Sequence, residues 1–524
     1  MHYRPASEVG DHKQGRNPSP RSLRFLAVAA AILFTASMVS AADKPLAKTP
    51  QSQGSWTAPF NVGVVAIHTA MLYTGNVLMW WYPPTATSTT EPAILFNPVT
   101  NAITNVDIPV SVQNGLVNEF FCAGESIMQD GKVLVTGGLS GIPPSEDLGI
   151  PEAVIFDPGS STWSYAANMN FARWYPTNVT LPNGVTMALS GINAQGTDTV
   201  APIEEYNETK NTWTILRTSA NLPANVETYP RMFITTAGKI VMAGQLQTTR
   251  QFDPGTNTWS ILGSWNFQGN RVYGSAALMP GLNQILTIGG RTSSTLCTKE
   301  DWTTCVTNTA EIFDLTTKTW TYTGSMAYAR QNANLEVLPD GTFIAVGGNQ
   351  VLRYDQAVFP AEIYNPSTGQ WTTMASQIGA RGYHSTAALL PDGRVLSAGA
   401  DYFPTGKTTY AETVEIFSPP YLFAGARPTI TSSPASVKYG AQFTISTPDA
   451  STIKTVALIR PSATTHAQDY EQRYVTLNFT AGGGIITATA PTTANMAPPG
   501  YYMIAIVNSS GVPAVMPFIQ LTIK

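Results

Sequence analysis

The segment AEIFDLTTKTW at residues 310–320 contains a short apolar strand, a turn and a tryptophan. This pattern recurs along the chain and indicates the fold. Four further copies end on a tryptophan in the same way: AVIFDPGSSTW (153–163), IEEYNETKNTW (203–213), RQFDPGTNTW (250–259) and AEIYNPSTGQW (361–371). Such repetition indicates that each unit is one small group of strands that stacks on its neighbours. The chain is therefore built from repeated β units.

A hairpin belongs to each unit as well. Its clearest turns have the Asp-Gly or Asn-Gly sequence that favours tight hairpins, at Asp130-Gly131, Asn183-Gly184, Asp340-Gly341 and Asp392-Gly393. Weaker copies lie at Thr74-Gly75, Ala237-Gly238 and Pro280-Gly281. Seven units of about four short strands each predict a seven-bladed kelch-type β-propeller over residues 58–427.

The composition supports an all-β protein with more than one domain. The 524 residues exceed the size at which one core stops growing, and 42 glycines, 38 prolines and only 12% charged residues favour short strands and turns. After Arg427-Pro428 the repeat stops, and alternating strands such as TVALIR (455–460) follow. We therefore predict an immunoglobulin-like β-sandwich over residues 428–524. A net charge of −4 and no run of Lys or Arg predict no nucleic-acid partner.

The N-terminal segment has the pattern of a secretory signal. Arg21 and Arg24 precede an apolar stretch at residues 25–39, and Ala41 ends a cleavage-like sequence. We predict a signal peptide over residues 1–41, a short linker over 42–57, and a secreted or extracytoplasmic protein. The alternative is an uncleaved cell-surface anchor, although the stretch is shorter than the roughly 20 residues of a membrane-spanning helix. No membrane span is expected after removal of the signal.

Three cysteines have to be placed in an oxidising compartment. Cys297 and Cys305 lie close together in a polar segment, and we predict that they form a disulfide within one loop. That pairing leaves Cys122 as the odd cysteine. Cys122 is either a buried inert thiol or a residue with a chemical role, and both interpretations stay open at this point.

The repeat register places seven residues at equivalent positions of the seven blades. Counting about eight residues back from each hairpin turn selects a ring around the axis: Ala66, Cys122, Tyr175, Tyr229, Tyr273, Asn332 and His384. Cys122 and Tyr175 belong to consecutive blades, so the odd thiol and a phenol become neighbours. Tyr383 and His384 can both point inward only where the strand is still irregular, because strand side chains alternate between faces.

Other histidines and tyrosines near this register have simpler interpretations. His68 follows Ala66 on the same strand face, where we interpret it as structural. Tyr229 and Tyr273 are interpreted as packing residues or pocket walls. His466 lies in a polar loop of the C-terminal part, and a histidine in such a loop is usually only solvated.

Four segments carry a resemblance to a known family: FFCAGES (120–126), ARWYPT (172–177), ARGYHSTAALLPDGRV (380–395) and TTHAQDYEQR (464–473). They resemble the galactose oxidase and glyoxal oxidase family of copper radical oxidases. The glyoxal oxidase branch is favoured, because ARWYPT and TYPRMF (228–233) are more similar to it. The family combines a seven-bladed kelch propeller with a C-terminal immunoglobulin-like domain, as predicted above.

The resemblance implies a site with one copper ion. Tyr175, His384 and His466 would be equatorial ligands and Tyr383 the axial one, while Cys122 would be joined to Tyr175 as a thioether radical cofactor. Nitrogen and oxygen ligands of this kind suit Cu(II). Tyr383 would act as the general base, and the radical on the Cys122-linked Tyr175 would take a carbon-bound hydrogen from the substrate.

The implied reaction oxidises a small aldehyde or primary alcohol with dioxygen and releases hydrogen peroxide, which a peroxide-using enzyme would consume downstream. The tryptophan that stacks on the linked tyrosine in galactose oxidase has no aromatic counterpart at Ile192 or Asn193, so Trp174 is the expected substitute. Because fold alone does not give function, the alternative is a secreted kelch-propeller adhesion or carbohydrate-binding protein with a relic copper site.

Overall fold

Strands make up nearly all regular structure in the computed structural model, which describes residues 49–83, 88–113, 116–141, 148–292, 305–351, 356–400 and 411–523. All of these residues belong to one unit, Thr49–Lys524. The predicted signal peptide and Cys297 lie outside the described residues, and Cys305 is held in a disulfide. Within the described ranges, no helix has the length and apolar character needed to cross a membrane.

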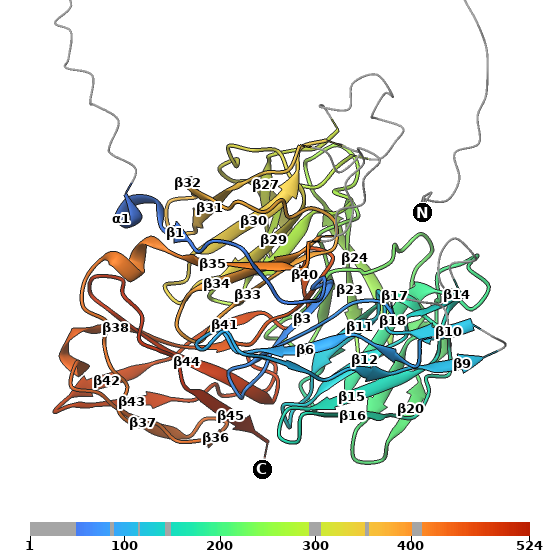
Figure 1. Cartoon of the computed structure of the whole chain (residues 1–524), viewed down its shortest axis with the longest axis horizontal. Coiled ribbons are helices and arrows are strands. Elements are labelled where there is room, and N and C mark those ends of the chain that lie inside the picture. The colour runs from blue at the N-terminus through green and yellow to red at the C-terminus, as the bar shows by residue number, and fades with distance from the viewer. Residues whose placement is uncertain are drawn as a thin grey trace, which may run out of the picture. The chain divides into compact units, whose positions relative to one another are not determined.

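Seven antiparallel sheets follow one another as propeller blades (Figure 1). Each contains four blade strands in hydrogen-bonded order, and the sheets of the first and last blades contain additional strands. The first three are β3 (His68–Met71), β4 (Val77–Trp80), β6 (Ala93–Phe96), β7 (Ile103–Asn105); β11 (Gly124–Ile127), β12 (Val133–Thr136), β15 (Ala153–Asp157), β16 (Thr162–Tyr165); and β17 (Trp174–Thr180), β18 (Thr186–Ile192), β19 (Glu204–Asn207), β20 (Thr212–Ile215).

The fourth to sixth blades are β21 (Met232–Ile234), β22 (Ile240–Met242), β23 (Thr248–Asp253), β24 (Thr258–Ser264); β25 (Ser275–Leu278), β26 (Gln284–Ile288), β27 (Ala310–Asp314), β28 (Thr319–Tyr322); and β29 (Gln331–Val337), β30 (Phe343–Asn349), β31 (Pro360–Asn365), β32 (Gln370–Ser376). The seventh combines β33 (Ser385–Leu389), β34 (Val395–Gly399) and β35 (Thr413–Ser418) with β1 (Ser55–Trp56). The all-β seven-bladed propeller is confirmed.

The last blade is closed by residues from the N-terminal end of the described chain. β1 pairs antiparallel with β35, with Trp56 opposite Phe417, and β2 (Phe60–Asn61) pairs with the same strand. The Trp56 indole nitrogen also donates to the carbonyl oxygen of Ala375 in the sixth blade, at 2.9 Å. This closure was not predicted, because a two-residue strand after the short helix α1 (Pro50–Gln53) leaves no pattern in the sequence.

Four of the five repeated tryptophans bond to the preceding blade or to the segment that leaves it. The Trp371 indole nitrogen has no hydrogen-bond partner among the described residues. The Trp213 indole nitrogen donates to the Ala167 carbonyl, at 2.8 Å, on the segment that leaves the second blade. The Trp259 indole makes the same bond to the Ala220 carbonyl, at 2.9 Å, after the third blade. Because a buried indole N–H needs an acceptor, the tryptophan that marks the repeat in the sequence is an interblade contact.

Buried Arg–Glu ion pairs recur in four blades, with both side chains fully buried: Arg173–Glu204, Arg271–Glu311, Arg330–Glu362 and Arg381–Glu415. The arginine lies just before the innermost strand and the glutamate on the third strand of the same blade. Arg330 also donates to the carbonyls of Gly347 and Pro360, each at 2.8 Å. These pairs therefore anchor the segments that enter the axis of the propeller.

Glu362→Gln should destabilise the protein, because it leaves the Arg330 charge buried without its carboxylate. Removing one partner of a buried pair costs about 3–5 kcal/mol, which a fall in the midpoint of thermal unfolding would report. Asp253→Asn is the matched control, since the Lys239–Asp253 pair is partly exposed and such pairs contribute little. Equal midpoints for both variants would contradict the structural role of the buried pair.

The C-terminal part forms a β-sandwich that shares its core with the propeller. One sheet has the order β36 (Ser436–Lys438), β45 (Phe518–Thr522), β44 (Gly500–Asn508), β38 (Ile453–Arg460) and β41 (Arg473–Thr476). The other has the order β37 (Gln442–Ser446), β43 (Ile485–Thr489) and β42 (Phe479–Gly482). One buried apolar cluster joins Val456 and Ile504 of the sandwich to Phe233 and Leu278 of the blades. The exact domain boundaries stay a prediction.

Two smaller sheets are formed by segments that lie within and between the first two blades in the sequence. One contains β14 (Leu148–Gly149), β13 (Leu139–Ser140), β10 (Leu116–Glu119) and β9 (Ser111–Gln113), and the other contains β5 (Thr90–Glu91) and β8 (Ile108–Pro109). Neither belongs to the repeat, so neither was predicted.

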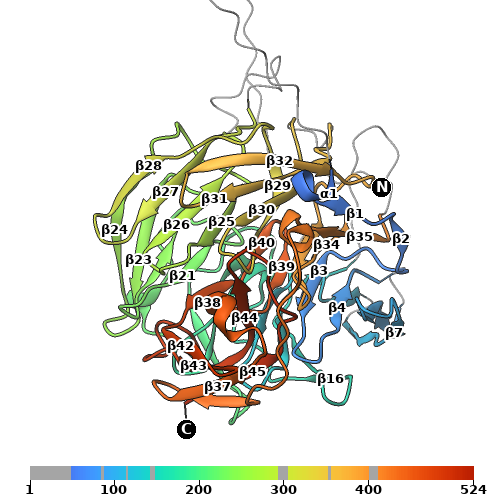
Figure 2. The ribbon, with the colours of Figure 1, turned by 90° about the vertical axis from the view of Figure 1, so that its left-hand side faces the viewer.

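A hairpin from the C-terminal part enters the propeller along its axis. It consists of β39 (Ala463–Thr465) and β40 (Gln468–Asp469), and β39 pairs antiparallel with β3, so that Thr465 lies opposite His68. Figure 2 shows both strands beside β3 and close to the inner strands of other blades. The hairpin also contacts β11, β25, β29 and β33. Its tip is therefore placed among the residues of the predicted ring.

Candidate metal centre

The ring predicted from the repeat register has an unusual backbone. Six of its seven residues adopt left-handed φ values between 49° and 63°: Cys122, Tyr175, Tyr229, Tyr273, Asn332 and His384. Such values are uncommon for residues with side chains, and they cost on the order of 1–3 kcal/mol each. Because the conformation interrupts strand alternation, it explains how adjacent residues such as Tyr383 and His384 can both belong to the site.

Backbone hydrogen bonds hold the ring residues of consecutive blades together. The Tyr175 N–H donates to the Cys122 carbonyl at 2.9 Å, and the Tyr229 N–H donates to the Tyr175 carbonyl at 3.0 Å. Between the last and first blades, Gly399 approaches so closely that a β-carbon would lie 2.5 Å from the Ala66 carbonyl oxygen. The thiol-bearing and phenol-bearing residues are thus fixed next to each other.

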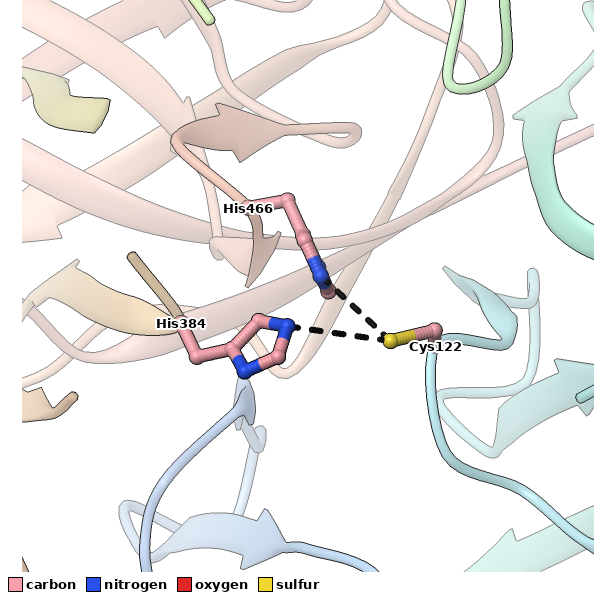
Figure 3. A group of neighbouring side chains, drawn as sticks. All are labelled: Cys122, His384 and His466. Atoms are coloured by element: carbon pink, nitrogen blue, oxygen red, sulfur yellow. Dashed lines mark hydrogen bonds between the residues drawn. The ribbon is translucent and has the colours of Figure 1, made fainter. Parts of the chain in front are cut away.

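Two histidines converge on the Cys122 sulfur. Its Sγ lies 3.4 Å from His466 Nε2 and 3.9 Å from His384 Nε2 (Figure 3). Among the described residues, these three form a group whose potential metal-binding atoms all lie within 4.8 Å of one another. His384 comes from the start of the last blade and His466 from the hairpin β39–β40. The structure therefore brings together residues 344 positions apart in the chain.

The two predicted tyrosines complete this cluster. Their hydroxyl oxygens, Tyr175 Oη and Tyr383 Oη, are 2.8 Å apart. The Tyr383 ring lies over His384 with ring centroids 3.9 Å apart, and His466 stands edge-on to Tyr175 at 5.1 Å and to Tyr383 at 5.2 Å. Tyr383 is partly exposed, whereas Cys122 is fully buried. All five predicted site residues are therefore gathered at one place.

The protonation of His466 is set by its neighbour. The Thr465 hydroxyl donates its single proton to the Ile67 carbonyl at 2.8 Å, so it can only accept from His466 Nδ1, at 2.7 Å. Burial, followed by the nearby His384, lowers the pKa of His466 well below its ordinary value. The imidazole is therefore neutral, with its proton on Nδ1 and the lone pair of Nε2 directed into the site.

The chemistry of this donor set fits a copper ion. Two imidazole nitrogens and two phenol oxygens are the nitrogen and oxygen donors that suit Cu(II). A neutral imidazole whose other nitrogen is hydrogen-bonded is the usual state of a metal ligand. The match rests on the chemistry of these residues.

Comparison with known proteins identifies the family. Residues 87–421, more than half of the chain, match the family model described as glyoxal oxidase N-terminus, and residues 427–521 match the galactose oxidase-like early set domain. The chain belongs to the glyoxal oxidase family. The resemblance drawn from the four sequence segments is thereby confirmed.

Relatives of this glyoxal oxidase family member include several named oxidases. A galactose oxidase of Gibberella zeae is 28% identical over 510 residues, which cover 90% of this chain and 71% of the relative. An aldehyde oxidase GLOX of Vitis pseudoreticulata is 26% identical over 94% of this chain and all of the relative. A solved fungal alcohol oxidase in complex with copper is 26% identical, with a TM-score of 0.77 over 90% of this chain and 100% of its own.

Further aromatic residues of this family member wall the cluster. The Tyr229 hydroxyl donates to the Ala123 carbonyl at 2.8 Å, and its ring packs on His466 at 4.9 Å, as expected of a wall residue. The Trp174 ring lies 4.4 Å from the Tyr175 ring at an interplanar angle of 51°. Trp174 therefore contacts the predicted radical tyrosine from the neighbouring position in the chain, tilted and not parallel.

His68 has more contacts with the site than its sequence position indicated. The Cys122 N–H donates to His68 Nε2 at 3.1 Å, and His68 Nδ1 bonds the buried carboxylate of Glu125. Burial, and then the nearby His384, lowers the pKa of His68, while burial raises the pKa of Glu125. Glu125 was not predicted, because the sequence around it indicates a role only for Cys122. The position of His68 on the same strand face as Ala66 was the available signal that His68 lies near the ring.

Thr465→Val should weaken copper binding, because it removes the acceptor that holds the His466 proton on Nδ1. Loss of such an outer contact typically costs about 10–100-fold in metal affinity, which competition titration with copper would measure. Thr464→Val is the matched control on the same strand, since the buried Thr464 hydroxyl has no hydrogen-bond partner among the described residues. Equal affinities for the two variants would contradict this assignment.

Proposed function

We propose that the protein is a copper-dependent oxidase that converts a small aldehyde or primary alcohol with dioxygen and forms hydrogen peroxide. The observation that carries the proposal is the convergence of His384 and His466 on the Cys122 sulfur. The rings of Tyr175 and Tyr383 pack against His466, and their hydroxyl oxygens are 2.8 Å apart. In the overall reaction, two hydrogens pass to dioxygen from the primary alcohol, or from the hydrate that the aldehyde forms with one water molecule. The names of the relatives, which include an alcohol oxidase and an aldehyde oxidase, support this class of reaction.

The site residues have distinct roles in this proposal. Tyr175, Tyr383, His384 and His466 would hold the copper ion, which would supply one-electron redox chemistry and a position for the substrate oxygen. Tyr383 is the partly exposed member of the tyrosine pair, so its oxygen would take the hydroxyl proton of the substrate. Tyr175 would take the carbon-bound hydrogen atom as a phenoxyl radical.

A thioether between Cys122 and Tyr175 would stabilise that radical. The bond joins Cys122 Sγ to a carbon of the Tyr175 ring, and two hydrogens leave to dioxygen, which becomes hydrogen peroxide. The supporting observations are the backbone bond between the two residues and their membership of one buried cluster with Trp174. Sulfur on the ring spreads the unpaired electron and makes the radical easier to form.

The approach to the cluster favours substrates with apolar parts. Phe121 stands edge-on to His384 at 5.3 Å, Tyr82 stands edge-on to Phe121 at 5.2 Å, and Trp81 lies 4.9 Å from Tyr82. Trp81 and Tyr82 are partly exposed, so aromatic rings lead from the surface to a copper ligand. Aromatic side chains of this kind typically line sites for small organic ligands, and they fit a substrate with an apolar part.

We also propose a location for the protein, a division of the site between two domains and a use for the peroxide. Residues 1–41 are proposed as a secretory signal, and the protein as secreted or extracytoplasmic. The propeller over residues 58–427 supplies four of the five site residues, and the domain over residues 428–524 supplies His466. The released peroxide would serve a peroxide-using enzyme nearby. A relic site in a binding protein would show copper binding without turnover.

Loading the protein with copper in air should join Cys122 to Tyr175. Peptide mapping is expected to find one peptide pair linked through these residues and lighter by two hydrogens than the separate peptides. The physical reason is that the ring register and the 2.9 Å backbone bond hold the two residues together. If Cys122 can still be alkylated in full after aerobic copper treatment, the proposed cofactor is wrong.

His466→Ala should lower copper affinity and abolish peroxide production, because the second imidazole comes only from the hairpin β39–β40. Copper titration and a peroxide assay with a simple primary alcohol and a small aldehyde measure both effects. Thr464→Val, on the same hairpin, is expected to keep both properties. Unchanged turnover in His466→Ala would remove this residue from the site.

A further inference from the structure

We propose that His68 is a positioning residue that holds Cys122 in place for its reaction with Tyr175 and joins this cysteine to the hairpin that carries His466. The inference rests on the proposed function, because positioning matters for the thioether. It adds two residues, His68 and Glu125, to which neither the repeat register nor the family resemblance gave a role.

The backbone of Cys122 is fixed on both sides. Its N–H donates to His68 Nε2 at 3.1 Å, and its carbonyl accepts the Tyr175 N–H at 2.9 Å. Cys122 itself has a left-handed φ of 54°, a conformation that persists only where the surroundings hold it. The bond to His68 is therefore one of the contacts that set the direction of the Cys122 side chain.

The orientation of His68 is fixed in turn. A backbone N–H can only donate, so Nε2 is the accepting nitrogen and the imidazole proton resides on Nδ1. Nδ1 then donates to Glu125, and the ring lies parallel to Trp80 at 4.6 Å and 5°. His68 and Glu125 are fully buried. The bond to Glu125 thus holds the imidazole proton on Nδ1, and stacking on Trp80 sets the plane of the His68 ring.

Both ring nitrogens of His68 are occupied, which separates it from the metal ligands. Nε2 accepts from Cys122 and Nδ1 donates to Glu125, so no lone pair is left for a metal ion. The group of potential metal-binding atoms within 4.8 Å accordingly contains His384 and His466 but not His68. His68 therefore acts on the site through Cys122.

The same strand also positions His466. His68 lies opposite Thr465 in the pairing of β3 with β39, and the Ile67 carbonyl accepts the Thr465 hydroxyl. That hydroxyl in turn accepts the Nδ1 proton of His466. Residues 67 and 68 thus fix the cysteine from the second blade and the histidine from the C-terminal hairpin at the same time.

The test uses the full-length chain and four variants. His68→Phe keeps the ring on Trp80 but removes both hydrogen bonds. Glu125→Leu removes the acceptor of Nδ1, so the imidazole can move its proton to Nε2 and lose the Cys122 contact. Glu125→Gln keeps an acceptor oxygen. Thr69→Val is the matched control, because it removes the 2.7 Å bond to Thr386 from the same strand without touching Cys122.

Three quantities are measured for each protein. The first is the rate of Cys122 alkylation by iodoacetamide without copper, the second the rate of thioether formation after copper and air, and the third copper affinity. For His68→Phe and Glu125→Leu we expect alkylation about ten-fold faster and thioether formation about ten-fold slower, with copper affinity close to wild type. Glu125→Gln and Thr69→Val should resemble wild type in all three.

The outcomes separate this inference from the proposed function. If the wild-type chain forms no thioether, the proposed cofactor fails, and the alkylation rates of the copper-free proteins alone decide the role of His68. Wild-type rates in His68→Phe would overturn the inference, and so would equal effects in Thr69→Val. Wild-type behaviour of Glu125→Leu would overturn it too, since packing alone would then account for His68. If His68→Phe does not fold, the comparison of Glu125→Leu with Glu125→Gln decides.

Discussion

The pairing of β39 with β3 is the interaction on which the site depends. Without it, the propeller would hold Cys122, Tyr175, Tyr383 and His384, but one imidazole would be missing. The pairing places His466 in the axis and also fixes its tautomer, because Thr465 faces both Ile67 and His466. A second domain thus completes a site that the repeat alone cannot build, since each blade contributes the same position of its inner strand.

The ring of left-handed residues explains how a regular repeat can serve chemistry. A regular strand directs alternate side chains to opposite faces, whereas the left-handed residue at six of the ring positions interrupts this alternation in or near the first residues of the inner strand. The buried Arg–Glu pairs lie two or three residues before Tyr175, Tyr273, Asn332 and His384 and hold the chain there. The buried ion pairs therefore hold the chain next to ring residues whose left-handed backbone is strained.

Most of the fold and part of the site could be predicted from the sequence. The tryptophans and the Gly-containing turns predicted the number of blades, because these short motifs recur from unit to unit in the sequence. The register brought Cys122 beside Tyr175 for the same reason. His466 required a family match, since the entry of the β39–β40 hairpin depends on tertiary pairing. The contact between His68 and Glu125 could not be predicted, because it spans 57 residues and belongs to no repeat.

The closure of the last blade has a consequence for the order of assembly. The strand β1 is synthesised first but finds its partner β35 only when the chain is almost complete, and the Thr57 contact to that strand spans 359 residues. The hydrogen bond from the Thr465 hydroxyl to the Ile67 carbonyl spans 398 residues. Contacts of such long range form late in folding. A chain that ends before β35 therefore lacks both the strand that closes the last blade and the second imidazole of the site.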